Sequence, residues 1–231
     1  MHETLEGFNY NMVVYDLGLS MEHMMVLEEL KNSNYISDLR VFNFSKYPSF
    51  WDIKNARGEY AWKPGMIKEV SEDYPGTLVW LDSGTRVERF FFKKLKNFIK
   101  KYGGFISPTS PGLMEDWTHP GVYDYYKDDH SKYDKLVNCN GGSVIFDTYR
   151  VQHLIDEWYD CALVKNCIAP VGSSRVNHRQ DQALLTYLAA RDNRYCNENR
   201  AVFGISTHLD KSCKEFISDY ELNHPELLIK H

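Results

Sequence analysis

The sequence predicts an α/β domain in which a mixed, mainly parallel central sheet is flanked by helices. Segments with strand-like and helix-like patterns alternate along most of the 231 residues, which is typical of this class. The apolar run at residues 78–81 suits a strand covered on both faces. An apolar content of 43% is sufficient for a full core. The length fits one domain spanning residues 1–231.

The stretch at residues 77–86 is central to this prediction, because its apolar run stops at Asp82. Ser83 and Gly84 follow and allow a tight turn. In open α/β sheets, ligands bind beyond the carboxyl ends of the strands. Asp82 is therefore predicted to contact a ligand. The alternative is that Asp82 caps the helix that follows, since Asp is a favoured N-cap residue.

The first half of the chain, residues 12–107, alternates between the two patterns. Strands are predicted at 12–15, 39–44, 78–82 and 105–107. Helices are predicted after Ser20, from Lys63 and Pro64, and over 87–102. This half is expected to bind a nucleotide, since a strand, a loop and a helix at the start are usual in nucleotide-binding domains.

The second half, residues 108–211, begins with a segment at 108–133 that is rich in Pro, Gly, Asp, Tyr and Trp and has weak periodicity. Long irregular loops in compact domains are often functional lids or binding loops, so it is predicted to form one; a surface loop held by its own aromatics is the alternative. The rest is predicted as strand–turn–strand over 137–148, helices over 149–164 and from Gln180, and a strand over 201–205. Residues 212–231 are expected to be a peripheral tail.

Bulk composition excludes some classes of function. A net charge of -5 provides no basic field for nucleic acid. The chain has no apolar run of about 18 residues that would span a membrane, and its first residues lack a signal-peptide pattern. We expect a soluble protein, either cytoplasmic or an excised lumenal Golgi domain. The five cysteines show no zinc spacing; reduced cysteines are the simpler interpretation, and disulfides stay open.

Polar residues recur at the ends of predicted elements. Asp16 and Asp82 end strands, the Asn140, Gly141 and Gly142 triplet precedes one, and Asp181 and Gln182 open a helix; His208 and Lys211 follow the last strand. Each has a plainer explanation as a cap, a turn, a partner of the helix dipole or a surface histidine. Their order along the chain is more specific than any one of them.

In this order the sequence resembles nucleotide-sugar-dependent glycosyltransferases of the GT-A fold, over about residues 12–211. The segment 80–84 resembles the metal-binding Asp-x-Asp strand end, and 140–147 resembles the Asn-x-Gly strand beneath the sugar. Asp181 with Gln182 is similar to the family's Asp-Gln helix start, and His208 with Lys211 to the C-terminal residues of glycosyltransferase family 8. Segments 15–19, 62–64 and 80–82 are most similar to a poorly characterised eukaryotic and viral branch.

The resemblance implies a single GT-A-type, Rossmann-like domain that transfers a hexose, with UDP as the expected nucleotide, to a hydroxyl of a glycan or protein acceptor. It also implies that residues 108–211 form the acceptor half, with the segment 108–133 as the acceptor wall. The residues implied to bind the donor are Tyr15, Asp16, Lys63, Asp82, Ser83, Gly84 and Lys211. Those implied to contact the sugar or acceptor are Asn140, Gly141, Gly142, Gln182 and Trp117. Asp181 and Asp116 are the candidate catalytic bases, because an inverting transfer needs a carboxylate within hydrogen-bond reach of the acceptor hydroxyl. A retaining transfer needs no such base and stays open.

One departure from the family pattern concerns the metal. Gly84 stands where the second Asp of Asp-x-Asp is expected, and a hard divalent ion needs oxygen ligands. Asp82 and His208 are the candidate ligands for Mn²⁺ or Mg²⁺, together with diphosphate oxygens and water. Neutralisation of the diphosphate by Lys or Arg side chains, or loss of activity, are the other outcomes.

Two competing functions follow from these residues. The first alternative is a catalytically inactive nucleotide- or glycan-binding protein of the same fold, suggested by Gly84. The second is a nucleotidyltransferase, which ranks last because residues 16–20 do not form a Gly-rich phosphate loop with a nearby Lys.

Overall fold

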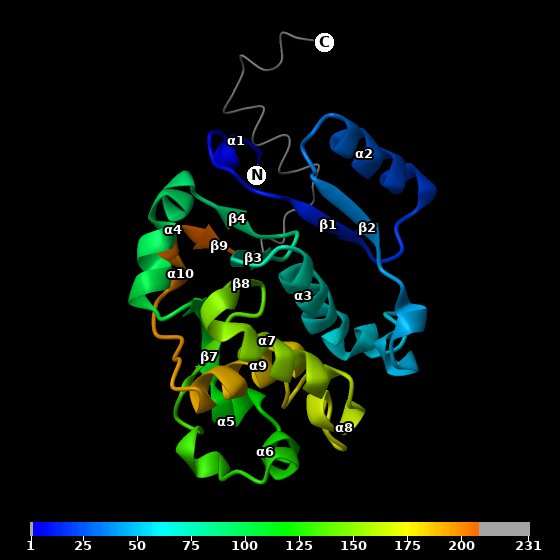
Figure 1. Ribbon diagram of the computed structural model, residues 1–231. Coiled ribbons are helices and arrows are strands. Elements are labelled where there is room, and N and C mark those ends of the chain that lie inside the picture. The colour runs from blue at the N-terminus through cyan, green and yellow to red at the C-terminus, as the bar shows by residue number, and fades with distance from the viewer. Residues whose placement is uncertain (1, 208–231) are drawn as a thin grey trace.

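A computed structural model of the chain describes residues 2–207 and has a mixed α/β architecture (Figure 1). Its centre is a three-stranded sheet in which β8 (Ser143–Asp147) lies between β3 (Thr77–Leu81) and β5 (Phe105–Ile106). Both pairings in this sheet are antiparallel. The prediction of a mainly parallel sheet is therefore wrong for the described residues, in which only β1 (Val13–Asp16) and β2 (Asp38–Val41) pair in parallel. An apolar run indicates burial on both faces but does not indicate strand direction.

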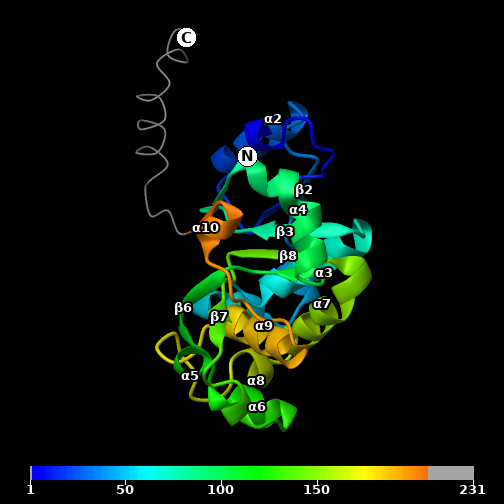
Figure 2. The ribbon, with the colours of Figure 1, turned by 90° about the vertical axis from the view of Figure 1, so that its left-hand side faces the viewer.

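Helices surround the central sheet, as the two views of the ribbon in Figures 1 and 2 show. The helix α3 (Trp62–Asp73) packs against α7 (Thr148–Ala162), which also contacts α9 (Gln180–Arg191). On another side, α4 (Arg89–Lys101) lies near the short pair of β4 (Arg86–Val87) and β9 (Ile205–Ser206). The helix α2 (Met21–Asn32) follows β1 and contains no buried residue.

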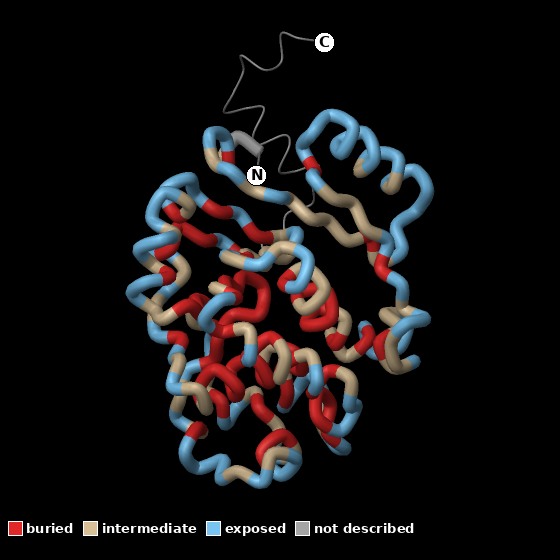
Figure 3. Tube along the Cα trace, in the orientation of Figure 1, coloured by how far each residue is buried: buried red, intermediate tan, exposed pale blue. Residues whose placement is uncertain are grey.

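The larger of two clusters of buried hydrophobic residues includes residues of α3, β8, α7 and α9, and Figure 3 marks the buried parts of the chain. Trp51 and Trp158 are fully buried in this core. Each indole also makes a hydrogen bond to a backbone carbonyl: Trp51 Nε1 donates to Ala162 O at 2.8 Å, and Trp158 Nε1 donates to Asp181 O at 3.0 Å. The second bond fixes the start of α9 relative to α7, because a buried indole N–H needs an acceptor.

Several short elements complete the described chain. They are α1 (His2–Leu5), η1 (Phe44–Lys46), η2 (Ser49–Trp51), η3 (Ala56–Tyr60), β6 (Thr109–Leu113), α5 (Met114–Trp117), α6 (Pro120–Tyr126), η4 (His130–Lys132), β7 (Val137–Cys139), α8 (Lys165–Ile168) and α10 (Arg200–Phe203).

Two predicted segments differ from the structure. The segment 108–133 is not irregular: it contains β6, α5, α6 and η4, and Tyr123 is buried against Tyr187. The strand predicted at 201–205 is mostly the helix α10, because the Asn199 side chain caps its first turn and Gly204, with φ at 62°, ends it. Short apolar runs do not distinguish a strand from a buried helix turn.

The turn η3 has an unusual backbone, since five consecutive residues have positive φ: 46° at Ala56, 57° at Arg57, 62° at Gly58, 48° at Glu59 and 55° at Tyr60. Left-handed helical geometry costs about 1–2 kcal/mol for each residue that has a Cβ. The turn is held by its surroundings. Gly58 N donates to Asn55 O at 2.8 Å, and a Cβ at Gly58 would lie 2.1 Å from a backbone oxygen of η2.

Four cysteines form two disulfides, Cys139–Cys196 and Cys161–Cys167. The first joins β7 to the segment after α9, and the second joins the end of α7 to α8. The interpretation of these four cysteines as reduced is therefore wrong; paired cysteines are typical of oxidising compartments. Cys213 lies outside the described residues. Between residues 2 and 207, no helix combines the length and the apolar character needed to cross a membrane.

Candidate functional site

The antiparallel pairing of β3 and β8 brings two predicted motifs together. Leu81 pairs with Ser143, so the carboxyl end of β3 meets the amino end of β8. The pairing continues one residue further, where Asp82 N donates to Gly142 O at 2.8 Å. Asp82 therefore lies beside the Asn140–Gly142 turn, although the sequence separates them by almost sixty residues.

The Asn140–Gly142 turn is buried and closed by its own hydrogen bonds. Asn140 Oδ1 accepts from Gly142 N at 2.8 Å, and Asn140 N donates to Pro108 O at 2.9 Å. Thr85 Oγ1 donates to Gly142 O at 3.2 Å. This turn has a single defined backbone path, because its polar groups are paired in the interior.

Gly142 lies so close to Asp82 that a side chain would fit only if its neighbours shifted by a few tenths of an ångström. A Cβ atom at Gly142 would be 3.1 Å from Oδ2 of Asp82 and 3.2 Å from Oδ1 of Asn140. At Gly141, a Cβ would be 3.1 Å from the Cβ of Gln182 and 3.4 Å from Oδ2 of Asp181. The two glycines therefore allow β8 to approach both carboxylate-bearing segments.

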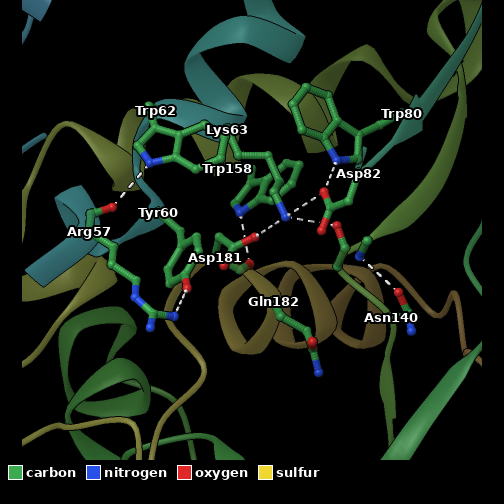
Figure 4. Close-up of polar contacts among 12 residues, drawn as sticks. Arg57, Tyr60, Trp62, Lys63, Trp80, Asp82, Asn140, Trp158, Asp181 and Gln182 are labelled. Carbon is green, nitrogen blue, oxygen red and sulfur yellow. Dashed lines mark hydrogen bonds and ion pairs between the residues drawn. The ribbon is translucent and has the colours of Figure 1, made fainter. Parts of the chain in front are cut away.

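Lys63 joins the two carboxylates (Figure 4). Its Nζ lies 3.0 Å from Oδ2 of Asp181 and 3.3 Å from Oδ1 of Asp82, and it donates to Gly141 O at 3.0 Å. Its side chain is only 6% exposed. The ammonium is thus surrounded by three oxygen atoms: the Gly141 carbonyl accepts a hydrogen bond from it, and the two carboxylates form ion pairs with it. Its predicted contact with the donor stays a prediction.

Asp82 is the more accessible carboxylate, with 37% of its side chain exposed. Its Oδ1 accepts a hydrogen bond of 2.7 Å from Trp80 Nε1 and faces Lys63. In the described part of the chain, its Oδ2 accepts no hydrogen bond. Trp80 was not among the predicted site residues. The signal was present, because residues two apart in a strand lie on one face.

Asp181 is the less accessible carboxylate, with 7% of its side chain exposed. It lies in the first turn of α9, directly after Gln180, whose φ is 34°. Burial raises the pKa of the Asp181 carboxyl, and attraction to Lys63 offsets part of that rise. Burial alone would lower the pKa of Lys63, but Asp181 and then Asp82 outweigh it, so the pKa of the ammonium is raised.

The first-strand residues Tyr15 and Asp16 are engaged elsewhere in the described residues. Tyr15 OH donates to Glu69 Oε2 at 2.7 Å. Asp16 Oδ1 accepts from Gly18 N at 2.7 Å and Leu19 N at 2.6 Å, which fixes the loop before α2. No contact joins either side chain to Lys63 or Asp82 within residues 2–207, so the nucleotide contacts predicted for Tyr15 and Asp16 stay predictions.

The structure places Asp116 and Trp117 on α5, and no hydrogen bond or ion pair joins either of them to Lys63 among the described residues. Asp116 Oδ2 accepts from Leu113 N at 2.7 Å, so its carboxylate caps the start of α5. The Trp117 ring lies beneath the guanidinium of Arg179, 3.9 Å from ring centre to Cζ. The proposed role of Asp116 as a base is thus less supported by position than that of Asp181.

Three further predicted residues surround the cluster. Ser83 is exposed and Gly84 lies in open space, with no heavy atom within 4 Å of where its Cβ would be. The Gln182 amide points away from Lys63 in Figure 4, and its buried Nε2 has no partner among the described residues.

His208 and Lys211 lie outside the described residues. Within residues 2–207 there is no group of three or more His, Cys, Asp or Glu side chains suited to a metal ion. The ammonium of Lys63 beside Asp82 would also repel a divalent cation at Oδ1. The described residues alone therefore do not fit a Mn²⁺ or Mg²⁺ site, and the cation that they do supply is Lys63.

The arrangement combines a buried ammonium, a buried carboxylate and a second carboxylate with one accessible oxygen, at the edge of a sheet. A search against protein-family models finds none that matches this chain, and a search of curated proteins finds no match either.

Proposed function

We propose that the protein is a glycosyltransferase of the GT-A type that transfers a sugar from a nucleotide-diphosphate sugar, UDP being the expected nucleotide, to an acceptor hydroxyl. The observation that carries this proposal is the sharing of one ammonium, Lys63, between Asp82 and Asp181. The first carboxylate ends a strand, the second opens a helix, and the Asn140–Gly142 turn lies against both.

Lys63 acts in this proposal as a positioning residue. Its three acceptors hold Asp82, Asp181 and the backbone of Gly141 in a fixed relation. Two carboxylates at this spacing repel each other, and a shared ammonium allows both to stay ionised. The donor then binds to a site whose charged groups are already oriented, and such preorganisation is the condition for electrostatic stabilisation of a transition state.

Asp82 would contact the donor through Oδ2, the carboxylate oxygen that accepts no hydrogen bond within residues 2–207. A carboxylate binds sugar or ribose hydroxyls directly by accepting their hydrogen bonds. The negative charge of the departing diphosphate needs a cation. Lys211 and His208 stay the proposed source of that charge, with Mn²⁺ or Mg²⁺ as a further candidate.

Asp181 would act on the acceptor hydroxyl or orient the transferred sugar. Burial raises the pKa of its carboxyl, which makes it a stronger base than an exposed carboxylate. In an inverting transfer it would take the proton of the attacking hydroxyl, and in a retaining transfer it would hold a sugar hydroxyl.

A second candidate is a donor-binding protein without turnover, and one observation favours it. The Asp181 side chain is 7% exposed and paired with Lys63, which limits its access to a substrate proton. This candidate predicts binding of nucleoside diphosphate by the same residues and no release of sugar.

The experiment is a hydrolysis and transfer assay with a panel of UDP-sugars and GDP-sugars, each with and without Mn²⁺. Wild type is compared with Asp82→Asn and with Asp124→Asn, a matched control at an exposed carboxylate on α6. We expect sugar release by wild type and by the control, and loss of release in Asp82→Asn. Equal release by Asp82→Asn would contradict the site, and nucleotide binding without release in wild type would favour the second candidate.

A further inference from the structure

Two arginines from distant parts of the chain converge on one phenol oxygen. Arg57 Nη1 donates to Tyr60 OH at 2.8 Å, and Arg175 Nη1 donates to the same oxygen at 2.7 Å. Arg57 and Tyr60 belong to the left-handed turn η3, whereas Arg175 lies before α9. Since the phenol oxygen accepts both bonds, its own O–H points elsewhere and has no acceptor among residues 2–207.

A third arginine, Arg179, follows Arg175 on the segment that leads into α9. Its pKa is lowered by burial and by the positive charge of Arg175. Arg179 stacks on Trp117 at 3.9 Å, and Arg175 lies over Tyr60 at 5.4 Å. Arg179 Nη1 also donates to Ser110 Oγ at 3.1 Å. Arg57 and Arg175, which share the Tyr60 hydroxyl, are called the arginine cluster below.

The arginine cluster has no acidic partner within the described part of the chain. Elsewhere in that part, exposed or half-buried arginines such as Arg40 and Arg191 pair with carboxylates. The nearest acid of the turn, Glu59, accepts from Gln180 Nε2 at 3.4 Å and makes no ion pair among the described residues. The two like charges held together by the Tyr60 phenol therefore lack a counter-charge, which an anion would supply.

The cluster lies beside the candidate site. Tyr60 is three residues before Lys63, and Arg175 is six residues before Asp181. In Figure 4, Arg57 and Tyr60 lie on one side of Asp181, and Trp80 and Asp82 lie on the other. The side bearing Asp82 and Asn140 is where the donor is proposed to bind, so the arginine side is left for the second substrate.

We propose that the arginine cluster and the Tyr60 hydroxyl bind an oxyanion group, a sulfate ester or a carboxylate, of an acidic oligosaccharide acceptor. Guanidinium groups match the planar and tetrahedral oxyanions by paired N–H donors, and the Tyr60 O–H adds a donor between them. Binding of the acidic oligosaccharide is independent of turnover, whereas its role as the acceptor rests on the proposed glycosyl transfer.

The test is isothermal titration calorimetry of the full chain with four probes at about 50 mM salt, where surface charge is weakly screened. The probes are a heparin hexasaccharide, the same hexasaccharide after desulfation, a hyaluronan hexasaccharide and UDP. The heparin and desulfated probes separate sulfate from carboxylate as the group bound. The variants are Arg57→Ala, Arg175→Ala and Tyr60→Phe, with Arg150→Ala as control, an exposed arginine at the opposite end of β8 that pairs with Asp147.

We expect each arginine variant to weaken binding of the preferred acidic hexasaccharide by about tenfold, the loss typical of one charge-assisted hydrogen bond. Tyr60→Phe should weaken this binding less, because the substitution removes a neutral hydrogen-bond donor. Arg150→Ala should bind as wild type does, and UDP affinity should be unchanged throughout. Thermal melting checks that each variant is folded, and Arg175→Lys, which keeps the charge, provides a conservative variant that should recover part of the loss.

Binding of neither acidic hexasaccharide by wild type, or equal binding by the arginine variants, would overturn the inference. A loss of UDP affinity in Arg175→Ala would assign the cluster to the donor and overturn it as well. Arginine-dependent binding of the hexasaccharide in a protein that releases no sugar would support the anion site while removing the proposed transferase function.

Discussion

The Nζ atom of Lys63 lies 3.0 Å from Oδ2 of Asp181, and both side chains are almost completely excluded from solvent. A buried ion pair is not by itself a source of stability, because desolvation of the charges offsets their attraction. Here the ammonium also pairs with Asp82. The more specific consequence is positional: removing the ammonium would leave a buried carboxylate without a counter-charge next to a second one.

Replacement of Lys63 by Met should lower the free energy of unfolding by about 3–5 kcal/mol, since breaking a buried pair from one side leaves the other charge uncompensated. Urea denaturation at neutral pH measures this change. The double variant Lys63→Met with Asp181→Leu removes both buried charges, and we expect it to recover at least part of the loss. If the single variant is as stable as wild type, the buried Asp181 carboxylate does not need Lys63 as its counter-charge.

The contact between Gly142 and Asp82 leads to a second prediction. Gly142→Ala places a methyl group 3.1 Å from Asp82 Oδ2 and 3.2 Å from Asn140 Oδ1, in a turn fixed by its own hydrogen bonds. Overpacking of this kind destabilises by about 1–3 kcal/mol, and it should also weaken nucleotide binding by displacing Asp82. Gly84→Ala is the matched control, because no atom lies within 4 Å of its Cβ; equal effects of the two substitutions would contradict the packing argument.

Gly84 offers a direct test of the missing metal ligand. Its open surroundings accommodate a longer side chain, so Gly84→Asp supplies a second carboxylate near Asp82 without a clash at its Cβ. We expect the Mn²⁺ affinity to rise by about tenfold, because affinity for hard cations increases with the number of charged oxygen ligands. A thermal-shift titration with Mn²⁺ measures it, and Gly84→Asn controls for size. An unchanged affinity would place the two side chains too far apart to share an ion.

The sequence predicted local elements better than their arrangement. The helix from Lys63 and Pro64 is confirmed as α3 (Trp62–Asp73), and the strand at 78–82 as β3. These succeed because periodicity and a proline at the start of a helix are local signals. The direction of β3 relative to β8 depends on connections that the pattern does not encode, so the parallel sheet was wrong.

The same limit applies to the site. Asp82, Asn140–Gly142 and Asp181 were selected from their positions at the ends of elements, and the structure brings them together. The contacts of Lys63 and the position of Trp80 required the structure. So did the arginine cluster, because the left-handed turn η3 has only one glycine in five residues and gives little local signal of its backbone.

His178 should make the stability of the fold depend on pH. It is fully buried, its Nε2 lies 2.8 Å from Ile168 O, and its Nδ1 accepts from His119 N at 3.3 Å. Burial lowers its pKa from 6.5 to about 4. Between these values the unfolded chain takes up a proton that the folded chain does not, so acidification favours unfolding. Stability is fully present above pH 6.5 and is lost as the pH falls toward about 4.

The size of this loss follows from the shift, since one unit of pKa corresponds to about 1.4 kcal/mol; for His178 the total approaches about 3 kcal/mol at pH 4. Urea denaturation at a series of pH values measures the free energy of unfolding for wild type, His178→Gln and His23→Gln, an exposed control on α2. Glutamine donates and accepts but does not titrate in this range. Its curve should be flatter than that of wild type between pH 6.5 and 4, whereas the control should follow wild type. Parallel curves for all three proteins would show that His178 takes up its proton over the same pH range in the folded and the unfolded chain. That result would contradict the lowered pKa of His178.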